Sequence, residues 1–304
     1  MIEVAVIVLR WLQYSGAVVL LGLPLFLLYS FRGGDGPNLV WARSTLIFAA
    51  TVVAVGSLAA LVAQTAVMAG SLSEALKPAS LSFMVTGMAL GMALVARAVL
   101  AGLALLAIVA LKPGRLLWTL LAAVGVIVSA SFAWTGHGAA TVGPGGLWHL
   151  TAAIIHAVSA PLWLGALVAL TVLLLRRTKP DDPAIHRALR GFAGVGTLAV
   201  ALLVLSGLGN SWFMIGPARI AGLGTSLYGQ LLITKLALFG LMLTLAASNR
   251  FRLTPALGSA LQASEPSAAA IRDLRRSLLL ETGLGLALLA VVAAMGTLPP
   301  PASL

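Results

Sequence analysis

The residues of this chain that could bind a soft metal ion are its histidines and methionines. His149 and His156 fall in one long apolar run, and His137 closes the run before it in the sequence FAWTGHG. A spacing of seven residues returns to the same helix face after two turns, about 10.5 Å further on. One ion cannot bind both rings directly, because metal–nitrogen bonds are about 2 Å long. The pair therefore serves two successive sites, or each ring joins ligands from other helices.

Methionine is the second unusual residue type. Met84, Met88 and Met92 follow one another at intervals of four residues. On one continuous helix this spacing gives a stripe of thioethers, with about 6 Å between neighbours along the axis. Apart from Met1 the chain has seven methionines, and all except Met242 fall in the membrane half that we expect to face outward. The alternative for each is that methionine fills gaps in helix packing.

Thioether and imidazole without thiolate form a soft-to-borderline ligand set, and the chain has no cysteine. Such a set suits copper, above all Cu(I), better than magnesium, calcium or manganese. Neutral ligands also let an ion leave, which conduction requires. We therefore predict that His137, His149, His156 and the methionine stripe line a path for copper ions. Two alternatives stay open: the histidines join helices by hydrogen bonds, or His137 and His156 ligate a haem in a membrane redox protein. The fourth histidine, His186, is expected to be solvated in a basic connection.

The elements that carry these residues are apolar runs. The chain of 304 residues is 60% hydrophobic and 9% charged. A soluble domain carries about 25% charged residues, so this composition indicates an integral membrane protein. Eight runs are each close to or above the roughly 20 residues that span a bilayer. They are about 4–31, 44–70, 81–111, 116–134, 147–175, 191–214, 228–248 and 278–298. We expect an all-α polytopic fold of eight transmembrane helices, forming one domain over 1–304.

The basic residues indicate which way this fold lies in the bilayer. Fourteen of the nineteen lysines and arginines fall in four of the connections between runs. They are Arg32, Arg43, Lys112, Arg115, Arg176, Arg177, Lys179, Arg187, Arg190, Arg250, Arg252, Arg272, Arg275 and Arg276. Basic connections stay in the cytoplasm, so we expect both termini in the periplasm of an inner-membrane protein. The net charge of +11 then faces anionic lipid and does not indicate a nucleic-acid partner.

Arg10, Arg97, Lys235 and Glu281 lie inside apolar runs, where an unpaired charge is costly. Counted from Leu81, Arg97 lies about 24 Å down its helix in the cytoplasmic half, and Glu281 begins the last run from that side. We therefore expect a structural ion pair between Arg97 and Glu281. A proton-coupling role for Glu281 is the alternative.

Residues 132–165 resemble the central signature of the copper-resistance D (CopD) family of bacterial inner-membrane proteins. The pattern is a Gly-His pair and then a helix reading His, six residues, Trp-x-Gly. Here it is Gly136–His137 and His156, Trp163 and Gly165. Later matching positions are Tyr228, Gly229, Lys235, Asn249, Arg250, Glu281 and Pro299–Pro300. The resemblance covers essentially the whole chain, most strongly from about residue 130 onward.

The resemblance implies eight helices and copper passage from periplasm to cytoplasm. It also implies a periplasmic copper-binding partner of the copper-resistance C type. His149 and the methionine stripe lie outside the signature, so their predicted role as ligands rests on ligand chemistry alone.

The chain has no phosphate-binding GxxxxGKS/T loop that would indicate transport driven by ATP. An inside-negative potential favours inward movement of a monovalent cation by about 2.3 kcal/mol per 100 mV. We predict a copper importer that is not an enzyme, with a non-transporting dock for a copper carrier as the alternative.

Overall fold

The computed structural model describes residues 2–31, 40–178, 181–264 and 266–303, which contain helices and connections but no strand. Eight helical segments in this part of the chain are long and apolar enough to cross a membrane, as the sequence predicts. The long helices are α1 (Ile2–Ser30), α2 (Val40–Ala69), α5 (Ala89–Ala110), α6 (Arg115–Ala130), α7 (Gly146–Arg176), α8 (Asp182–Met214), α9 (Leu227–Ser248) and α11 (Ala268–Met295). The shorter elements are α3 (Leu72–Ala75), α4 (Pro78–Gly87), α10 (Thr254–Gln262), the 3₁₀ helices η1 (Ser131–Trp134), η2 (His137–Ala139), η4 (Pro217–Thr225) and η6 (Pro301–Ser303), and the π-helix η5 (Asn249–Leu253).

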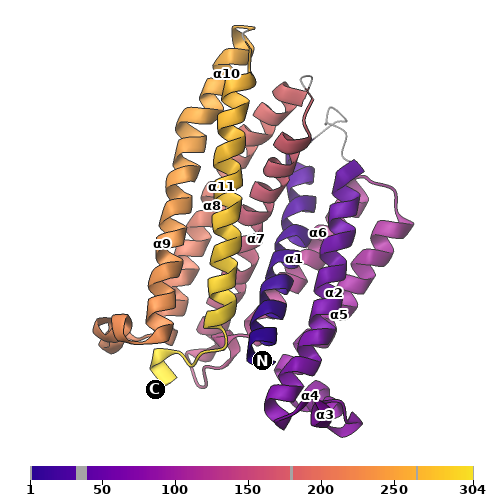
Figure 1. The fold of residues 1–304 in the computed structure, drawn as a ribbon, viewed down its shortest axis with the longest axis vertical. Helices are drawn as coiled ribbons and strands as arrows, with labels where there is room; N and C mark the ends of the chain where they lie inside the picture. The colour runs from indigo at the N-terminus through magenta and orange to yellow at the C-terminus, as the bar shows by residue number, and fades with distance from the viewer. Residues whose placement is uncertain (1, 32–39, 179–180, 265, 304) are drawn as a thin grey trace.

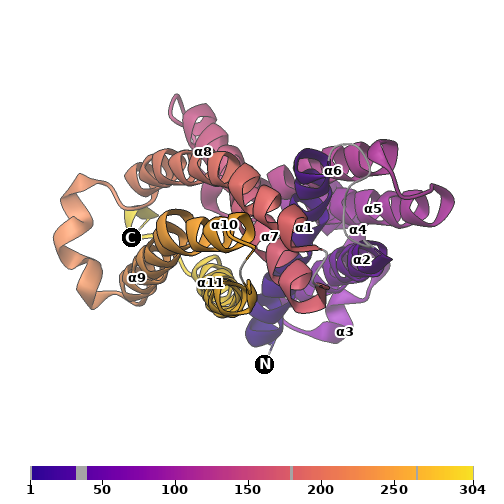
Figure 2. The ribbon, with the colours of Figure 1, turned by 90° about the horizontal axis from the view of Figure 1, so that it is seen from above.

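The helices α1 and α7 form the centre of the bundle (Figure 2). α1 packs against α2, α6, α7 and α11, and α7 packs against α8 and α11 as well. The two central helices cross where Gly22 meets Gly165. A Cβ atom on Gly22 would lie 2.4 Å from the carbonyl oxygen of Pro161 and 2.5 Å from the Cα atom of Gly165. Small residues allow this close backbone approach in a membrane bundle, so the crossing fixes α1 against α7.

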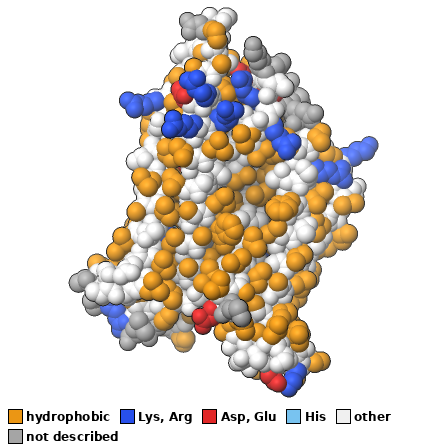
Figure 3. Space-filling view, in the orientation of Figure 1, with side chains coloured by type: hydrophobic (Ala, Val, Ile, Leu, Met, Phe, Trp, Pro, Cys, Tyr) orange, Lys and Arg blue, Asp and Glu red, His pale blue; other side chains and the backbone are white. Residues whose placement is uncertain are grey.

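The bundle has two chemically different ends. Ile2 and Ser303 lie at one end, together with α3, α4 and η4 (Figure 1), and we call it the N/C end. At the opposite end, which we call the basic end, lysine and arginine side chains gather above a broad apolar belt (Figure 3). This separation of charge follows the expected pattern of basic connections. Arg32 and Lys179 of that pattern lie outside the described residues.

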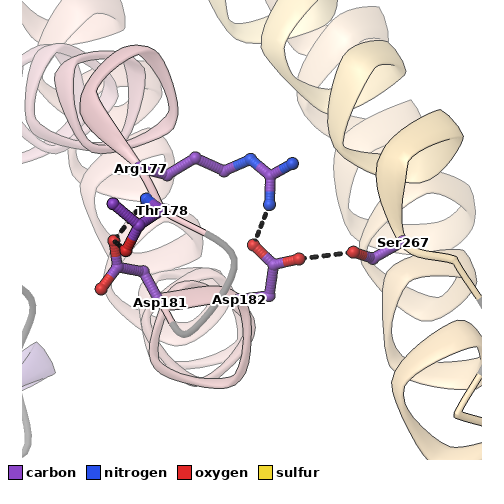
Figure 4. Close-up of polar contacts among 5 residues, drawn as sticks. All are labelled: Arg177, Thr178, Asp181, Asp182 and Ser267. Atoms are coloured by element: carbon purple, nitrogen blue, oxygen red, sulfur yellow. Dashed lines mark hydrogen bonds and ion pairs between the residues drawn. The ribbon is translucent and has the colours of Figure 1, made fainter.

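Hydrogen bonds at the basic end tie three long helices together (Figure 4). Asp182 opens α8, and its carboxylate accepts from Arg177 at the end of α7 and from Ser267 at the start of α11. Asp181 accepts from the backbone N–H of Thr178 at 2.6 Å. Carboxylates at a helix N-terminus are also favoured by the helix dipole. These contacts fix the basic-end termini of α7, α8 and α11 relative to one another.

The third apolar run departs from the expected single helix over 81–111. The chain leaves helical geometry at Met88, with φ −132° and ψ 130°, so α4 and α5 are separate helices. At the turn, Gly91 lies against the backbone of Met84, where a Cβ atom would be 2.0 Å from the Met84 carbonyl oxygen. The membrane-spanning part therefore begins at Ala89. The sequence alone does not reveal the break, because both sides of it are equally apolar.

Candidate metal-ion path

His149 stands in the first turn of α7 at the N/C end. Its ring is 2% exposed and stacks on Phe213 of α8, with centroids 5.0 Å apart and planes at 15°. The Nδ1 atom lies 2.7 Å from the Thr141 hydroxyl. The Nε2 atom is buried and has no hydrogen-bond partner among the described residues. One edge of the imidazole is thus held in place and the other is free to bind a ligand.

His156 lies two turns further along the same face of α7, and its Nδ1 atom is 3.0 Å from the hydroxyl oxygen of Ser206 on α8. That hydroxyl has one proton and donates it to the Leu202 carbonyl at 2.5 Å. When Ser206 donates to that carbonyl, its oxygen accepts from an N–H at Nδ1, and the lone pair then lies on Nε2. This is the tautomer in which imidazole binds a metal through Nε2. Lys235 of α9 lies close enough to act on His156 electrostatically.

His137 belongs to η2, the 3₁₀ turn that follows η1. It lies beside the backbone of Met295 and Leu298, at the C-terminal end of α11. Burial lowers the pKa of the His137 imidazole, and hydrogen bonding to the Leu298 backbone partly opposes that effect. Its Nε2 atom is buried without a hydrogen-bond partner in the described part of the chain. A neutral imidazole with an open nitrogen is a suitable metal ligand.

Two methionines lie near these histidines at the N/C end. Met214 directly follows Phe213, on which His149 stacks, and its sulfur accepts a hydrogen bond from the Tyr228 hydroxyl at 3.3 Å. Met295 is 7% exposed and packs in one cluster with Tyr228. Thioethers and imidazoles therefore lie at the same end of the bundle, where α7, α8, α9 and α11 begin or end. Sequence reasoning placed Met214 and Met295 in the half of the bundle that carries the termini but gave them no role, because no regular spacing links them.

The expected stripe of Met84, Met88 and Met92 is wrong as geometry. The break at Met88 puts Met84 on α4 and Met92 on α5, so no single helix face carries the three side chains. Met84 is 1% exposed, whereas Met92 is 52% exposed on the outside of the bundle. A spacing of four residues aligns side chains only along an unbroken helix.

Comparison with known proteins decides which family this arrangement belongs to. The family model described as copper resistance protein D-like, N-terminal domain, matches residues 1–147, and the model described as copper resistance protein D matches residues 186–295. The chain is 38% identical over 303 residues to copper resistance protein D of Pseudomonas syringae pv. tomato, which covers 97% of this chain and 96% of that protein. This chain belongs to the copper resistance protein D family.

A second relative of this CopD-family chain is copper transport protein CutJ of Bacillus subtilis (strain 168). The two are 30% identical over 182 residues, which are 58% of this chain but only 29% of CutJ. No solved structure matches the chain. Together with the eight apolar helices, the relatives identify a multi-pass membrane protein of a copper resistance and transport family.

The expected ion pair between Arg97 and Glu281 is absent among the described residues. Arg97 is 1% exposed and donates to the side-chain oxygens of Gln13 at 2.6 Å, Ser131 at 3.0 Å and Thr135 at 3.2 Å. Because α5 begins at Ala89, Arg97 is about 12 Å from the N/C end of its span. Glu281 is about 21 Å from the N/C end of α11. The helix break is therefore the reason why the two depths do not match.

Trp163 continues the face of α7 on which the histidines stand, seven residues after His156. It is 2% exposed, and its ring meets Phe239 of α9 edge-on at 5.6 Å. The carboxyl group of Glu281 lies beside it. One face of the CopD-family α7 thus runs from the N/C end past His149 and His156 to a buried acid.

The described ranges contain no group of three histidine, cysteine, aspartate or glutamate side chains that could hold a metal ion. His186, the histidine expected to be solvated, is instead partly covered by α10. A Cβ atom on Gly258 would lie 2.7 Å from its Nε2 atom. Sequence reasoning missed Ser206 and Phe213, because nothing but the fold brings α8 against α7.

Proposed function

We propose that this chain imports copper, as Cu(I), from the periplasm to the cytoplasm across the bacterial inner membrane. The observation that supports this most is the face of α7 on which His149 and His156 stand two turns apart. Each ring is held at Nδ1 by a hydroxyl from a neighbouring segment, Thr141 or Ser206. Nε2 of His149 has no hydrogen-bond partner among the described residues, and in our proposal Nε2 of both rings binds the ion. Two such positions about 10.5 Å apart give successive sites across an apolar layer.

The ligand chemistry at the N/C end supports a soft monovalent ion. His137, His149, Met214 and Met295 offer neutral nitrogen and sulfur, which favour Cu(I) over hard cations. Neutral ligands in small numbers bind weakly enough for an ion to move on. Lys235 beside His156 adds a repulsion that shortens the stay of a second positive charge there. We infer that the ion enters between these histidines and methionines and then passes to His156.

The direction of transport is inferred from charge. The positive-inside rule assigns the basic end to the cytoplasm and the N/C end to the periplasm. An inside-negative potential then draws a monovalent cation inward by about 2.3 kcal/mol per 100 mV. A periplasmic copper-binding protein of the copper-resistance C type is the proposed donor. It would dock on the N/C end, where α3, α4 and η4 project from the bundle (Figure 1).

Radiocopper uptake into proteoliposomes, with ascorbate present and an inside-negative potential imposed, tests the proposal. His149→Ala and His156→Ala should both reduce uptake per folded protein. The loss should be larger for His156→Ala, because water can replace a ligand more easily at the mouth than two turns deeper. His186→Ala removes a histidine from beside α10, outside the path, and should leave uptake unchanged. Wild-type uptake no faster than in empty liposomes would reject the import function.

The same experiment separates the two alternatives. Copper binding by the wild-type protein without uptake would support a dock for a copper carrier. The structure gives the haem hypothesis no support, because His137 lies against the end of α11 and His156 lies against α8. An intense Soret band in the visible spectrum of the purified protein would restore that hypothesis, since Cu(I) gives none.

A further inference from the structure

A cavity of about 230 Å³ lies in the basic half of the bundle, lined by α7, α8, α9, η5 and α11. Most of its wall is apolar and includes Trp163, Leu167 and Phe192. Its polar residues are few: Glu281, Asn249, Thr197, Thr254 and Arg250. Water occupies about 30 Å³ per molecule in the liquid, so this space could hold an ion with several waters.

The polar groups beside the cavity are incompletely satisfied. Glu281 is 0% exposed, its Oε2 atom accepts from Asn249 Nδ2 at 2.8 Å, and the Trp163 side chain also forms a hydrogen bond with its carboxyl group. The Oδ1 atom of Asn249 is buried without a hydrogen bond in the described part of the chain. An ionised Glu281 cannot donate to this oxygen. A buried acceptor without a donor is costly, and either a cation in the cavity or a proton on Glu281 would remove that cost.

No basic side chain described in the structure forms an ion pair with Glu281. Arg250 lines the same cavity, but its guanidinium donates to the hydroxyl of Thr197 and the carbonyl of Ala193 on α8. Away from the two ends of the bundle, Glu281 is the only acidic residue that the described spans contain. A carboxyl group at this depth either takes up a proton or pairs with a cation, and the cavity gives a cation room to reach Glu281.

The position of the carboxyl group connects it with the histidines. It lies beside Trp163, which follows His156 by seven residues on the same face of α7. From the N/C end the order along α7 is two imidazoles and then an indole ring, and the carboxyl group lies beside the indole.

We propose that Glu281 and Asn249 form a cation site that binds the copper ion after His156 and releases it at the basic end. This inference rests on the proposed import function. Oxygen atoms are poor ligands for Cu(I) compared with sulfur and nitrogen, so the ion is held there mainly by the charge of Glu281. Such a site offsets the cost of a cation in the apolar layer and still lets it leave.

The test compares Glu281→Gln with wild type in two measurements: Cu(I) bound per folded protein and uptake into proteoliposomes. Glutamine keeps the size and a hydrogen bond to Asn249 but removes the charge. Bound copper should fall by one ion per protein, and uptake should fall about tenfold or more, as expected for losing a charge–charge attraction. Glu281→Asp keeps the charge and should retain more of both. Asp273→Asn removes a carboxylate from an exposed turn of α11 and should behave as wild type.

Asn249→Leu provides a second variant in case Glu281→Gln does not fold. It keeps the carboxylate but removes the amide oxygen, and it too should lower bound copper. Wild-type binding and uptake in both variants would overturn the proposed site. So would reduced uptake with unchanged bound copper and altered proton movement, because Glu281 would then hold a proton and not the ion. If the wild type binds copper without transporting it and Glu281→Gln still loses one ion, the site stands and the import function falls.

Discussion

In the proposed path, a single hydroxyl group orients the imidazole of His156. When Ser206 donates to the Leu202 carbonyl it accepts from the imidazole, and Nδ1 then carries the proton. Groups that orient a metal-binding imidazole in this way affect metal affinity about tenfold to a hundredfold. We predict that Ser206→Ala lowers Cu(I) affinity by that factor while the protein still folds, as measured by competition with a Cu(I) chelator.

The matched control for this prediction is Thr234→Ala. Thr234 makes the same kind of bond to the carbonyl four residues earlier, but on an exposed position of α9. Its loss should leave the affinity unchanged. An equal affinity for Ser206→Ala and Thr234→Ala would show that the hydroxyl does not orient a metal ligand.

The methionines at the N/C end give a second prediction. Leucine resembles methionine in volume and polarity, so each Met→Leu exchange should cost less than about 1.5 kcal/mol of stability. We expect the double variant Met214→Leu/Met295→Leu to fold and to lose most copper uptake. The triple variant at Met84, Met88 and Met92 should fold and keep its uptake, because these side chains share no face.

Uptake in proteoliposomes, normalised to folded protein, is the measurement for both variants. The reverse result, with uptake lost only in the triple variant, would mean that the thioether ligands are in the α4–α5 region.

The two methionine sets also show what residue spacing can predict. The spacing of His149 and His156 placed them correctly because α7 is unbroken, whereas the same kind of reasoning failed across the turn at Met88.

At the scale of elements, the crossing of α1 and α7 limits what the bundle can tolerate. We predict that Gly165→Ala destabilises the protein by about 1–3 kcal/mol, the usual cost of overpacking. The reason is that a Cβ atom there would lie 2.5 Å from the Cα atom of Gly22. Thermal unfolding in detergent, followed by circular dichroism, measures the effect.

Gly283→Ala is the matched control for that substitution. Gly283 also lies inside a long helix, but no atom comes within 4 Å of its ideal Cβ position. Alanine is the better helix former by about 1 kcal/mol, so this variant should be as stable as wild type or more so. A similar loss of stability in both variants would mean that glycine at the crossing has no packing role.

The existence of the elements could be predicted from the sequence more completely than their limits. Long apolar runs between basic connections indicated all eight spans, because a lipid layer demands uninterrupted helices. The turn between α4 and α5 could not be inferred from the sequence. It depends on a close contact in which the backbone of Met84 packs directly against Gly91, where a side chain would not fit. Because of this turn Arg97 lies nearer the N/C end than expected, so it does not reach Glu281 and contacts Gln13 instead, while Glu281 contacts Asn249.

At the scale of the whole molecule, the orientation in the bilayer can be tested directly. An even number of spans places Ile2 and Ser303 at one end (Figure 1). We predict that alkaline phosphatase fused after Leu304 is active, because it folds only in the periplasm. The same enzyme inserted in the basic connection at Lys112 should be inactive. Activity at Lys112 and none after Leu304 would reverse the orientation and with it the direction of transport.

The sequence indicated the family of this chain but not the route of the candidate path. The motif around His156 and Trp163 indicated the family, which the comparisons confirm, whereas the soft ion inferred from histidine, methionine and the absence of cysteine stays a prediction. The route depends on which helices are neighbours, and apolar runs of similar composition do not encode this in a readable pattern. The contact of α7 with α8 and the position of Glu281 beside Trp163 therefore emerged only from the fold.

The unequal packing around α9 has a mechanical consequence. Among the described long helices, α9 packs extensively only along α11, whereas α8 packs along α7, which is itself fixed to α1. The α9 helix is therefore the least anchored of the described long helices, because α11 is itself held to α1, α7 and α8. A movement of α9 alone would change the width of the cavity that it lines beside Glu281, and the crossing of Gly22 and Gly165 would stay intact.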